Sequence, residues 1–376
     1  MQDRLHRTLL RLLGIPESRH DLAAENRGEL QVGSVVVEKW LFTAEPGSRI
    51  PANLYRPQAA SGRTPAIVMT CGHGDSKSVP HMTYVAQTYA RAGVACLLAD
   101  PLGEEERYPD GSVGTREHDK PEVAYRTERA GRSVMGKLVF DAMRGIDFLH
   151  TLNWIDTDRI GVTGNSLGGA VASWLFALDP RLRATIVSGW TFTDDLRYRA
   201  KHCSTAPIHA LRAVCEWREF LALGSENNAL LVLNGDADTV IDKAQSGAPW
   251  RDTVTHLNAF AAGDRCARYW FCPGGGHRPY QGNKEALRFI HEHLGTPRMT
   301  AEQIESLREL HFGTWCDRHG IAQERLYGTE LHYRGAILPD LGQAFIPREQ
   351  LEVLTPGELG TPEFTIDGWL SKLDSK

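Results

Sequence analysis

The sequence contains no run of about 18 uninterrupted apolar residues, so it predicts no membrane-spanning helix. It also lacks an excess of positive charge, since 42 Lys and Arg residues stand against 47 Asp and Glu residues, a formal net charge of −5. A mildly acidic chain without a basic block has no electrostatic footprint for nucleic acid or for an anionic membrane. Hydrophobic residues make up 41% of the 376 residues, which is typical of globular proteins and excludes disordered and fibrous classes. We therefore expect a small-molecule partner, with the oligomeric state left open.

Cysteine is scarce and forms no paired motif. None of the seven cysteines belongs to a C-x-x-C pair, so the sequence predicts no zinc site, no other metal and no redox cofactor. Their odd number, with several in apolar runs, indicates free thiols in a reducing compartment. Residues 1–15 carry charges among leucines at helical spacing, which predicts an amphipathic helix rather than a signal peptide. Together these features predict a cytoplasmic protein.

Short apolar runs alternate with helical patterns along most of the chain. A β-rich stretch at residues 35–42, a turn and a second stretch at 49–55 predict an antiparallel hairpin. A continuous apolar run, typical of a strand buried on both faces, follows at residues 66–71, and further strands are predicted at 94–99, 159–163, 184–188, 229–233 and 267–271. Helical patterns alternate with them at residues 81–91, 138–149 and 167–178, and a closing helix follows at 287–294. This alternation predicts an α/β fold with a doubly wound, mainly parallel sheet.

The chain length allows two to three domains, or one large domain with an appendage. We assign residues 1–30 to an N-terminal helical segment, 31–295 to a catalytic domain and 296–376 to a C-terminal extension. Two segments interrupt the alternation, at residues 101–129 and 190–228, and we expect both to wall a substrate pocket. In the extension, Thr300-x-x-Gln303 is a capping box that predicts a helix continuing to residues 315–317.

One serine stands in a motif of nucleophilic catalysis. Gly164-Asn165-Ser166-Leu167-Gly168 has the pattern G-x-S-x-G, directly after a predicted buried strand and directly before a predicted helix. Small residues two positions on either side let the neighbouring backbone pass close to the serine. The turn would expose the Ser166 hydroxyl at the carboxyl edge of the sheet, where such sheets bind ligands. The alternative is an ordinary glycine-rich turn in which Ser166 caps the helix.

A nucleophilic serine needs a base, and the base needs an orienting acid. His277 follows a predicted strand in a glycine loop at residues 273–276, which makes it the candidate base. The acid is expected after the preceding strand, where the pattern G-x-x-D favours Asp238. Asp236 and Asp242 are the competitors, and Asp236 is better explained as the residue of an Asx-turn.

Acyl chemistry also needs hydrogen-bond donors for an oxyanion. The backbone amide of Leu167 is the expected first donor, because it immediately follows the nucleophile. The second is expected in the loop after the strand at residues 66–71. There we nominate Gly74 or Asp75, with Gly72 and His73 shaping the turn.

In this ordered set of motifs the chain resembles the α/β-hydrolase superfamily over about residues 35–295. Three further patterns resemble the prolyl-oligopeptidase and acetyl-xylan-esterase-like branch: Asp141-x-x-Arg144-x-x-Asp147, Asp158-Arg159-Ile160-Gly161 and Asp100-Pro101-Leu102-Gly103. The motifs and the resemblance together predict a serine hydrolase that cleaves a carboxylic ester through a Ser-His-Asp triad, with a carbohydrate acetyl ester as one candidate substrate. The alternatives are a peptidase or amidase with the same triad, and a binding module without activity.

Several polar or aromatic residues near the predicted strand ends are candidates for contacts with the substrate. These candidates are His73, Lys77, Glu104, Arg107 and Trp190. The charged ones could bind a polar or anionic group, and Trp190 could offer an apolar or sugar-stacking surface.

Overall fold

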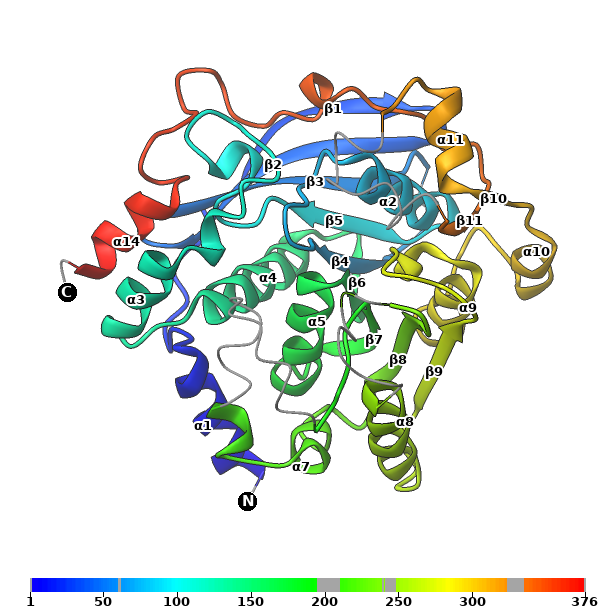
Figure 1. Cartoon of the computed structure of the whole chain (residues 1–376). Coiled ribbons are helices and arrows are strands. Elements are labelled where there is room, and N and C mark those ends of the chain that lie inside the picture. Colours follow the sequence, from blue (N-terminus) through cyan, green and yellow to red (C-terminus); the bar gives the residue numbers. More distant parts are fainter. Residues whose placement is uncertain are drawn as a thin grey trace.

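The computed structural model describes residues 2–59, 62–194, 210–238, 240, 248–322 and 335–374. A sheet of nine strands, in the order β1-β2-β3-β5-β4-β6-β7-β8-β9, runs through the molecule with helices on both faces (Figure 1). No helix in these ranges combines the length and the apolar character needed to cross a bilayer.

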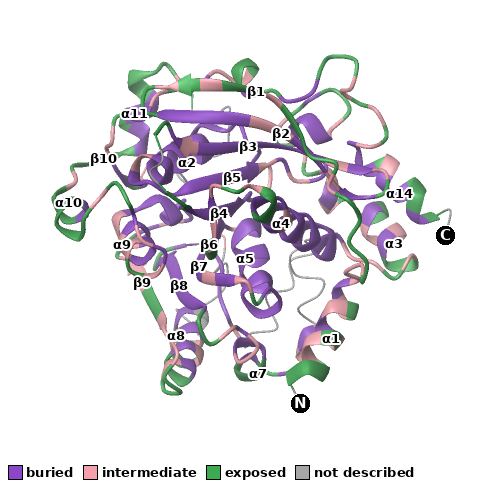
Figure 2. Ribbon diagram, turned by 180° about the vertical axis from the view of Figure 1, so that it is seen from behind, coloured by how far each residue is buried: buried purple, intermediate pink, exposed green. Residues whose placement is uncertain are grey.

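Three antiparallel strands form one end of the sheet. β2 (Val35–Glu45) and β3 (Ser48–Pro57) are the predicted hairpin, which is confirmed. β1 (Glu25–Val32) pairs with β2, so a strand begins inside the segment that the sequence assigns to helix, after α1 (Gln2–Leu13). β1 is polar and lies largely exposed at the sheet edge (Figure 2), which is why its sequence lacks the apolar alternation of a strand.

The other six strands are parallel to one another, as predicted. They are β5 (Ala95–Ala99), β4 (Thr64–Thr70), β6 (Ile155–Asn165), β7 (Leu182–Ser188), β8 (Ala229–Gly235) and β9 (Ala267–Cys272). From β4 the chain moves to β5 on one side and then returns to β6 on the other. The strand order therefore reverses between β4 and β6, and an open α/β sheet binds its ligand at such a switch point.

Helices cover the two faces of the sheet and bury a separate apolar cluster on each. α4 (Val134–Thr151) and α5 (Leu167–Leu178) pack on one face, and α2 (Pro80–Ala92) and α9 (Lys284–His293) on the other. Side chains of β4 alternate between them, because successive residues of a strand point to opposite faces: Val68 joins the first cluster and Ile67 the second.

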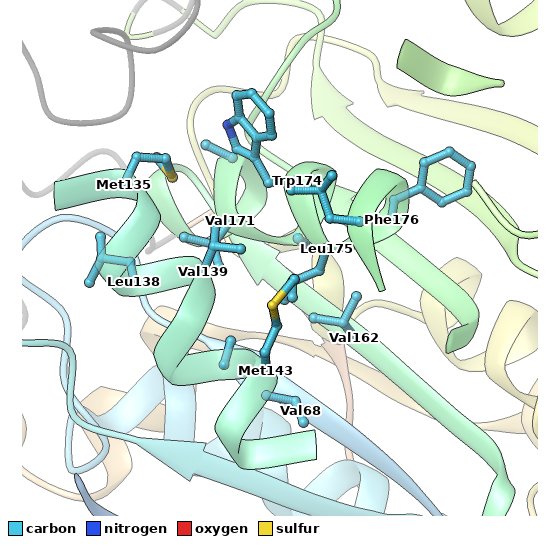
Figure 3. Close-up of a cluster of buried hydrophobic side chains, with 14 of the residues drawn as sticks. Val68, Met135, Leu138, Val139, Met143, Val162, Val171, Trp174, Leu175 and Phe176 are labelled. Atoms are coloured by element: carbon cyan, nitrogen blue, oxygen red, sulfur yellow. The ribbon is translucent and has the colours of Figure 1, made fainter. Parts of the chain in front are cut away.

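The cluster between α4 and α5 includes residues of β6. Figure 3 shows Val139 and Met143 of α4 and Val171 and Leu175 of α5, with Val162 of β6 nearby. α5 has the bounds predicted from the sequence, and both of its ends are buried. This packing fixes the helix that begins at the candidate nucleophile.

The remaining helices lie in the insertions and around the edge of the sheet. They are α3 (Pro121–Arg129), α7 (Trp217–Leu221), α8 (Ala248–Ala261) and the short 3₁₀ turns η1 (Glu105–Arg107), η2 (Glu117–Asp119), η3 (Tyr280–Gly282) and η4 (Arg348–Gln350).

The C-terminal extension adds short elements that join the two apolar clusters or, around Phe312, Trp315 and Leu338, form a small further cluster with Tyr84 of α2. They are α10 (Ala301–Ser306), β10 (Glu309–His311), α11 (Phe312–Arg318), β11 (Ile337–Pro339) and α14 (Ile366–Asp374). The capping box of Thr300 and Gln303 is present, but the prediction of one helix to residues 315–317 is wrong. The helix ends at Ser306 because the chain then leaves to pair β10 with β11, a contact between segments distant in sequence.

Candidate active site

Ser166 stands at the junction of β6 and α5, in the strand–turn–helix context that the motif requires. Its φ of 59° and ψ of −120° are rare for a residue with a side chain. The flanking glycines explain how the turn closes. A Cβ on Gly168 would lie 2.3 Å from the Thr70 carbonyl oxygen, and one on Gly164 would lie 2.4 Å from the backbone of Gly168. The spacing of the motif therefore reflects close backbone contact around a strained serine.

His277 and Asp238 meet at the carboxyl edge of the sheet. His277 Nδ1 lies 2.7 Å from Asp238 Oδ2, and both side chains are buried. The other carboxylate oxygen, Oδ1, accepts the Val240 amide at 2.9 Å. Because an ionised carboxylate only accepts hydrogen bonds, the contact favours the tautomer with the proton on Nδ1, which leaves Nε2 as the basic nitrogen.

The two competing acids have other positions. Asp236 is exposed and accepts the Gly274 amide at 2.6 Å, so it ties together the loops that follow β8 and β9. Asp242 lies outside the described residues. Beneath the same loop, Tyr280 donates its hydroxyl to the Gly276 carbonyl at 2.8 Å, which holds the backbone next to His277.

Gly189, just after β7, marks where the histidine approaches the serine. A Cβ built on Gly189 would lie 2.9 Å from His277 Cε1 and 3.0 Å from the Ser166 backbone nitrogen. Both atoms are therefore within 3.0 Å of one point, although Ser166 and His277 are far apart in sequence. Gly189 has φ +58° and donates its amide to the Leu233 carbonyl at 3.0 Å. This glycine leaves the space into which the imidazole fits.

The loop after β4 passes beside the serine turn. A Cβ on Gly72 would lie 3.2 Å from the Asn165 carbonyl oxygen, whereas Gly74 faces Gly114 of the insertion. The Asp75 amide donates to the Gly72 carbonyl at 3.2 Å, so this amide is engaged inside the loop. Of the residues nominated here, Gly72 contacts the serine turn, and Leu167 begins α5 directly after Ser166.

Lys77 does not face a substrate, contrary to the sequence-based expectation. Its side chain is completely buried, and Nζ pairs with Asp100 at 2.7 Å, Glu105 at 3.3 Å and Glu106 at 2.6 Å. Burial opposes the charged amine, but these three carboxylates outweigh it and raise the pKa of Lys77 well above its ordinary value. The correction follows from a general rule: a buried charge persists only where partners surround it.

Arg107 and Glu104, also expected from the sequence to contact a substrate, are both engaged with partners inside the protein. Arg107 is completely buried and pairs with Asp141 at 2.8 Å. Glu104 accepts the backbone amides of Gly114, Thr115 and Arg116 at 2.7–3.0 Å. Burial raises the pKa of Glu104 to about 7, against the opposing effect of these amides. Both side chains hold the insertion together.

The last two candidates lie closer to the serine turn. Trp190 is 6% exposed and belongs to the apolar cluster, with its Cβ 3.0 Å from a Cβ built on Gly169 at the start of α5. His73 is half-buried, and its Nε2 lies 3.2 Å from Asp119 Oδ1. Trp190 therefore acts mainly in packing, whereas His73 belongs to a polar contact between the loop after β4 and the insertion.

Comparisons with known proteins find two family models and two partial relatives. The family model described as acetyl xylan esterase (AXE1) matches residues 18–201, and that of the prolyl oligopeptidase family matches residues 128–295. The protein YtaP of Bacillus subtilis (strain 168) is 23% identical over 197 residues, 50% of this chain and 63% of YtaP. The acyltransferase drtE of Aspergillus calidoustus is 28% identical over 180 residues, 47% of this chain and 49% of drtE. The chain thus matches less than two thirds of the length of either relative.

Among solved structures, methylesterase BT1017 superimposes with a TM-score of 0.59 at 16% identity, covering 100% of this chain and 75% of that chain. The strand order, the serine turn and this similarity show that the chain has the α/β-hydrolase fold. The family models are more specific: one part of the chain is similar to acetyl xylan esterases, and an overlapping part is similar to the prolyl oligopeptidase family.

Proposed function

We propose that the protein hydrolyses a carboxylic ester through an acyl-enzyme intermediate, with Ser166 as nucleophile, His277 as general base and Asp238 as orienting acid. The observation that carries the proposal is the 2.7 Å contact between His277 and Asp238 beside a strained serine. The approach of the His277 ring and of the Ser166 backbone to the same side of Gly189 supports the proposal further.

In the first half of the proposed reaction, His277 Nε2 accepts the hydroxyl proton as Ser166 Oγ bonds to the ester carbonyl carbon. The resulting oxyanion accepts the Leu167 amide and a second amide from the loop at residues 72–75. Each such donor typically contributes about 2.7–4 kcal/mol to the transition state. Cleavage of the ester bond expels the alcohol, which takes the proton from His277.

In the second half, water attacks the acyl carbon and gives its proton to His277. Collapse of this intermediate returns the proton to Ser166 Oγ and releases a carboxylic acid. Throughout, Asp238 accepts the Nδ1 hydrogen bond and stabilises the imidazolium that forms in each half.

For the substrate we propose a short-chain ester of a carbohydrate. Support comes from the match of residues 18–201 to the acetyl xylan esterase family model, and methylesterase BT1017 with the same fold also acts on an ester.

The second candidate function is that of a peptidase or amidase. The observation that favours it is the match of residues 128–295 to the prolyl oligopeptidase family.

For the location we propose the reducing cytoplasm. The buried thiols of Cys71 and Cys96, neither of which is in a disulfide, support this proposal.

Purified protein tests the activity with p-nitrophenyl esters of increasing acyl length, acetylated xylo-oligosaccharides and aminoacyl p-nitroanilides. We expect turnover of the short esters and the acetylated sugars, whereas selective turnover of anilides would favour the peptidase. A fluorophosphonate probe should label the wild type but not Ser166→Ala. Ser173→Ala is the matched control, because Ser173 is a buried serine of the same helix. Labelling that persists in Ser166→Ala would refute the assignment of the nucleophile.

A further inference from the structure

Three potential metal ligands converge beside the loop that follows β4. One ligand atom each from His73, His118 and Asp119 lies within 4.8 Å of the others. His73 belongs to the loop itself, and His118 and Asp119 belong to η2 in the insertion. The ring centroids of the two histidines are 5.5 Å apart with an interplanar angle of 23°. No sequence pattern indicates this cluster, because the two histidines are 45 residues apart in the chain and form no compact motif.

His118 is the unusual member of the cluster. It is 1% exposed, and within the described part of the chain neither ring nitrogen has a hydrogen-bond partner of ordinary geometry. A buried polar group without a partner costs free energy, so a missing partner would explain its position.

We propose that His73, His118 and Asp119 bind one zinc ion. Two imidazoles and one carboxylate are a ligand set that zinc prefers, and three protein ligands leave a fourth position for water or another small ligand. Tetrahedral coordination with bonds of about 2.0–2.1 Å places ligand atoms about 3.3 Å apart. The separation of 3.2 Å between His73 Nε2 and Asp119 Oδ1 agrees with that value.

A neighbouring arginine partly neutralises the negative charge of the cluster. The guanidinium of Arg116 holds Asp119 Oδ2 at 3.0 Å, which leaves Oδ1 facing His73. This positive charge opposes the cation and limits the affinity.

A zinc ion here would join two segments of the proposed active site. Its ligand His73 follows Gly72, which contacts the serine turn, and its other ligands lie in the insertion expected to wall the pocket. The ion would therefore fix the loop that supplies the proposed second oxyanion donor. Binding itself does not depend on the proposed hydrolysis, so the two ideas can fail separately.

The test is a titration of chelator-treated protein with Zn²⁺ by calorimetry, together with Co²⁺ titration followed by visible absorption. We expect one Zn²⁺ per chain and a Co²⁺ spectrum of low-symmetry, four-coordinate type in the wild type. His118→Ala should weaken zinc binding more than about a hundredfold, since loss of even an outer-shell partner costs 10–100-fold. Asp119→Asn keeps a group that can hydrogen-bond to His73 but loses the charge, and it should weaken binding similarly.

His256→Ala is the matched control, because His256 pairs with Asp194 at 3.1 Å in a separate contact. It should bind zinc as the wild type does. The proposal is overturned if the wild type binds no stoichiometric zinc, or if Asp119→Asn, shown to be folded by circular dichroism, binds it with unchanged affinity. In that case the cluster is a histidine–aspartate contact without a metal.

Discussion

Gly189 provides the sharpest test of the proposed site, because replacing it adds one methyl group where the histidine meets the serine. In Gly189→Ala the new Cβ would lie 2.7 Å from Asn165 Oδ1, 2.9 Å from His277 Cε1 and 3.0 Å from the Ser166 nitrogen. Carbon atoms in contact normally lie about 3.5–4.0 Å apart. The imidazole or the backbone of the turn must therefore move by roughly 0.5–1 Å.

That displacement has two separable costs. A misplacement of about 1 Å can reduce turnover about a hundredfold, which corresponds to about 2.7 kcal/mol in kcat/KM. The positive φ of residue 189 adds a backbone penalty of about 1–2 kcal/mol to folding for any residue with a side chain. Gly189→Ala should thus lose about a hundredfold in activity in addition to the stability that its positive φ costs.

Gly342→Ala separates these costs, since Gly342 has φ +74° and no described atom lies within 4 Å of the position that a Cβ would take there. We expect it to lower the free energy of unfolding by about 1–2 kcal/mol and to leave hydrolysis of p-nitrophenyl acetate unchanged. The measurements are urea unfolding and kcat/KM for both variants at one temperature. If Gly189→Ala hydrolyses the ester as fast as Gly342→Ala does, the histidine is not held against the serine as described.

Three further outcomes are expected. First, Ser166→Ala or His277→Ala should lower kcat by up to about 10⁶-fold, and Asp238→Asn should lower it by about 10⁴-fold. Steady-state ester hydrolysis measures these losses, and a small effect of all three variants would exclude the triad. Burial tends to raise the pKa of Glu45, but neighbouring Lys and Arg side chains outweigh it and bring that pKa to about 2. Glu45 therefore stabilises the fold by roughly 3 kcal/mol above pH 4.5, and this is lost as the pH falls towards 2. Urea unfolding should show the deficit of Glu45→Gln at pH 7 shrinking towards pH 3, whereas a constant deficit would contradict the pKa. Trp369→Ala should cost about 3–5 kcal/mol in thermal unfolding, because Trp369 is 1% exposed in the main apolar cluster; a change below 1 kcal/mol would mean that α14 is dispensable.

The sequence predicts the parallel part of the sheet well because most of its strands, although not the edge strand β9, are largely buried. Apolar runs of this kind are easy to recognise in a sequence. The ends of helices are also marked by typical residues, as Asn283 and Gly295 mark the two ends of α9. The position of Ser166 and the first residue of α5 are also predictable, because they belong to a motif with fixed spacing. A serine turn needs small residues at fixed spacing, so Ser166 and the start of α5 can be located from the motif alone.

The sequence does not reveal contacts between residues that are far apart in the chain. Charged residues such as Lys77 are exposed by default, and nothing nearby in the chain distinguishes a buried ion pair from a substrate contact. The edge strand β1 lacks an apolar face and is recognisable only through its pairing with β2. His118 likewise has no local signal, since its neighbours in space come from the loop after β4.

The buried carboxylates also explain what the C-terminal extension does for the site. Glu106 pairs with Lys77, which lies just after the loop at residues 72–75, and its Oε1 accepts the amides of Val353 and Leu354 at 2.8 and 2.6 Å. One carboxylate therefore connects the proposed oxyanion loop, the insertion and the extension. Removing the extension would leave this buried charge without two of its donors, which typically costs more than the bonds themselves contribute. The extension is thus part of the support of the active-site loop rather than an independent appendage.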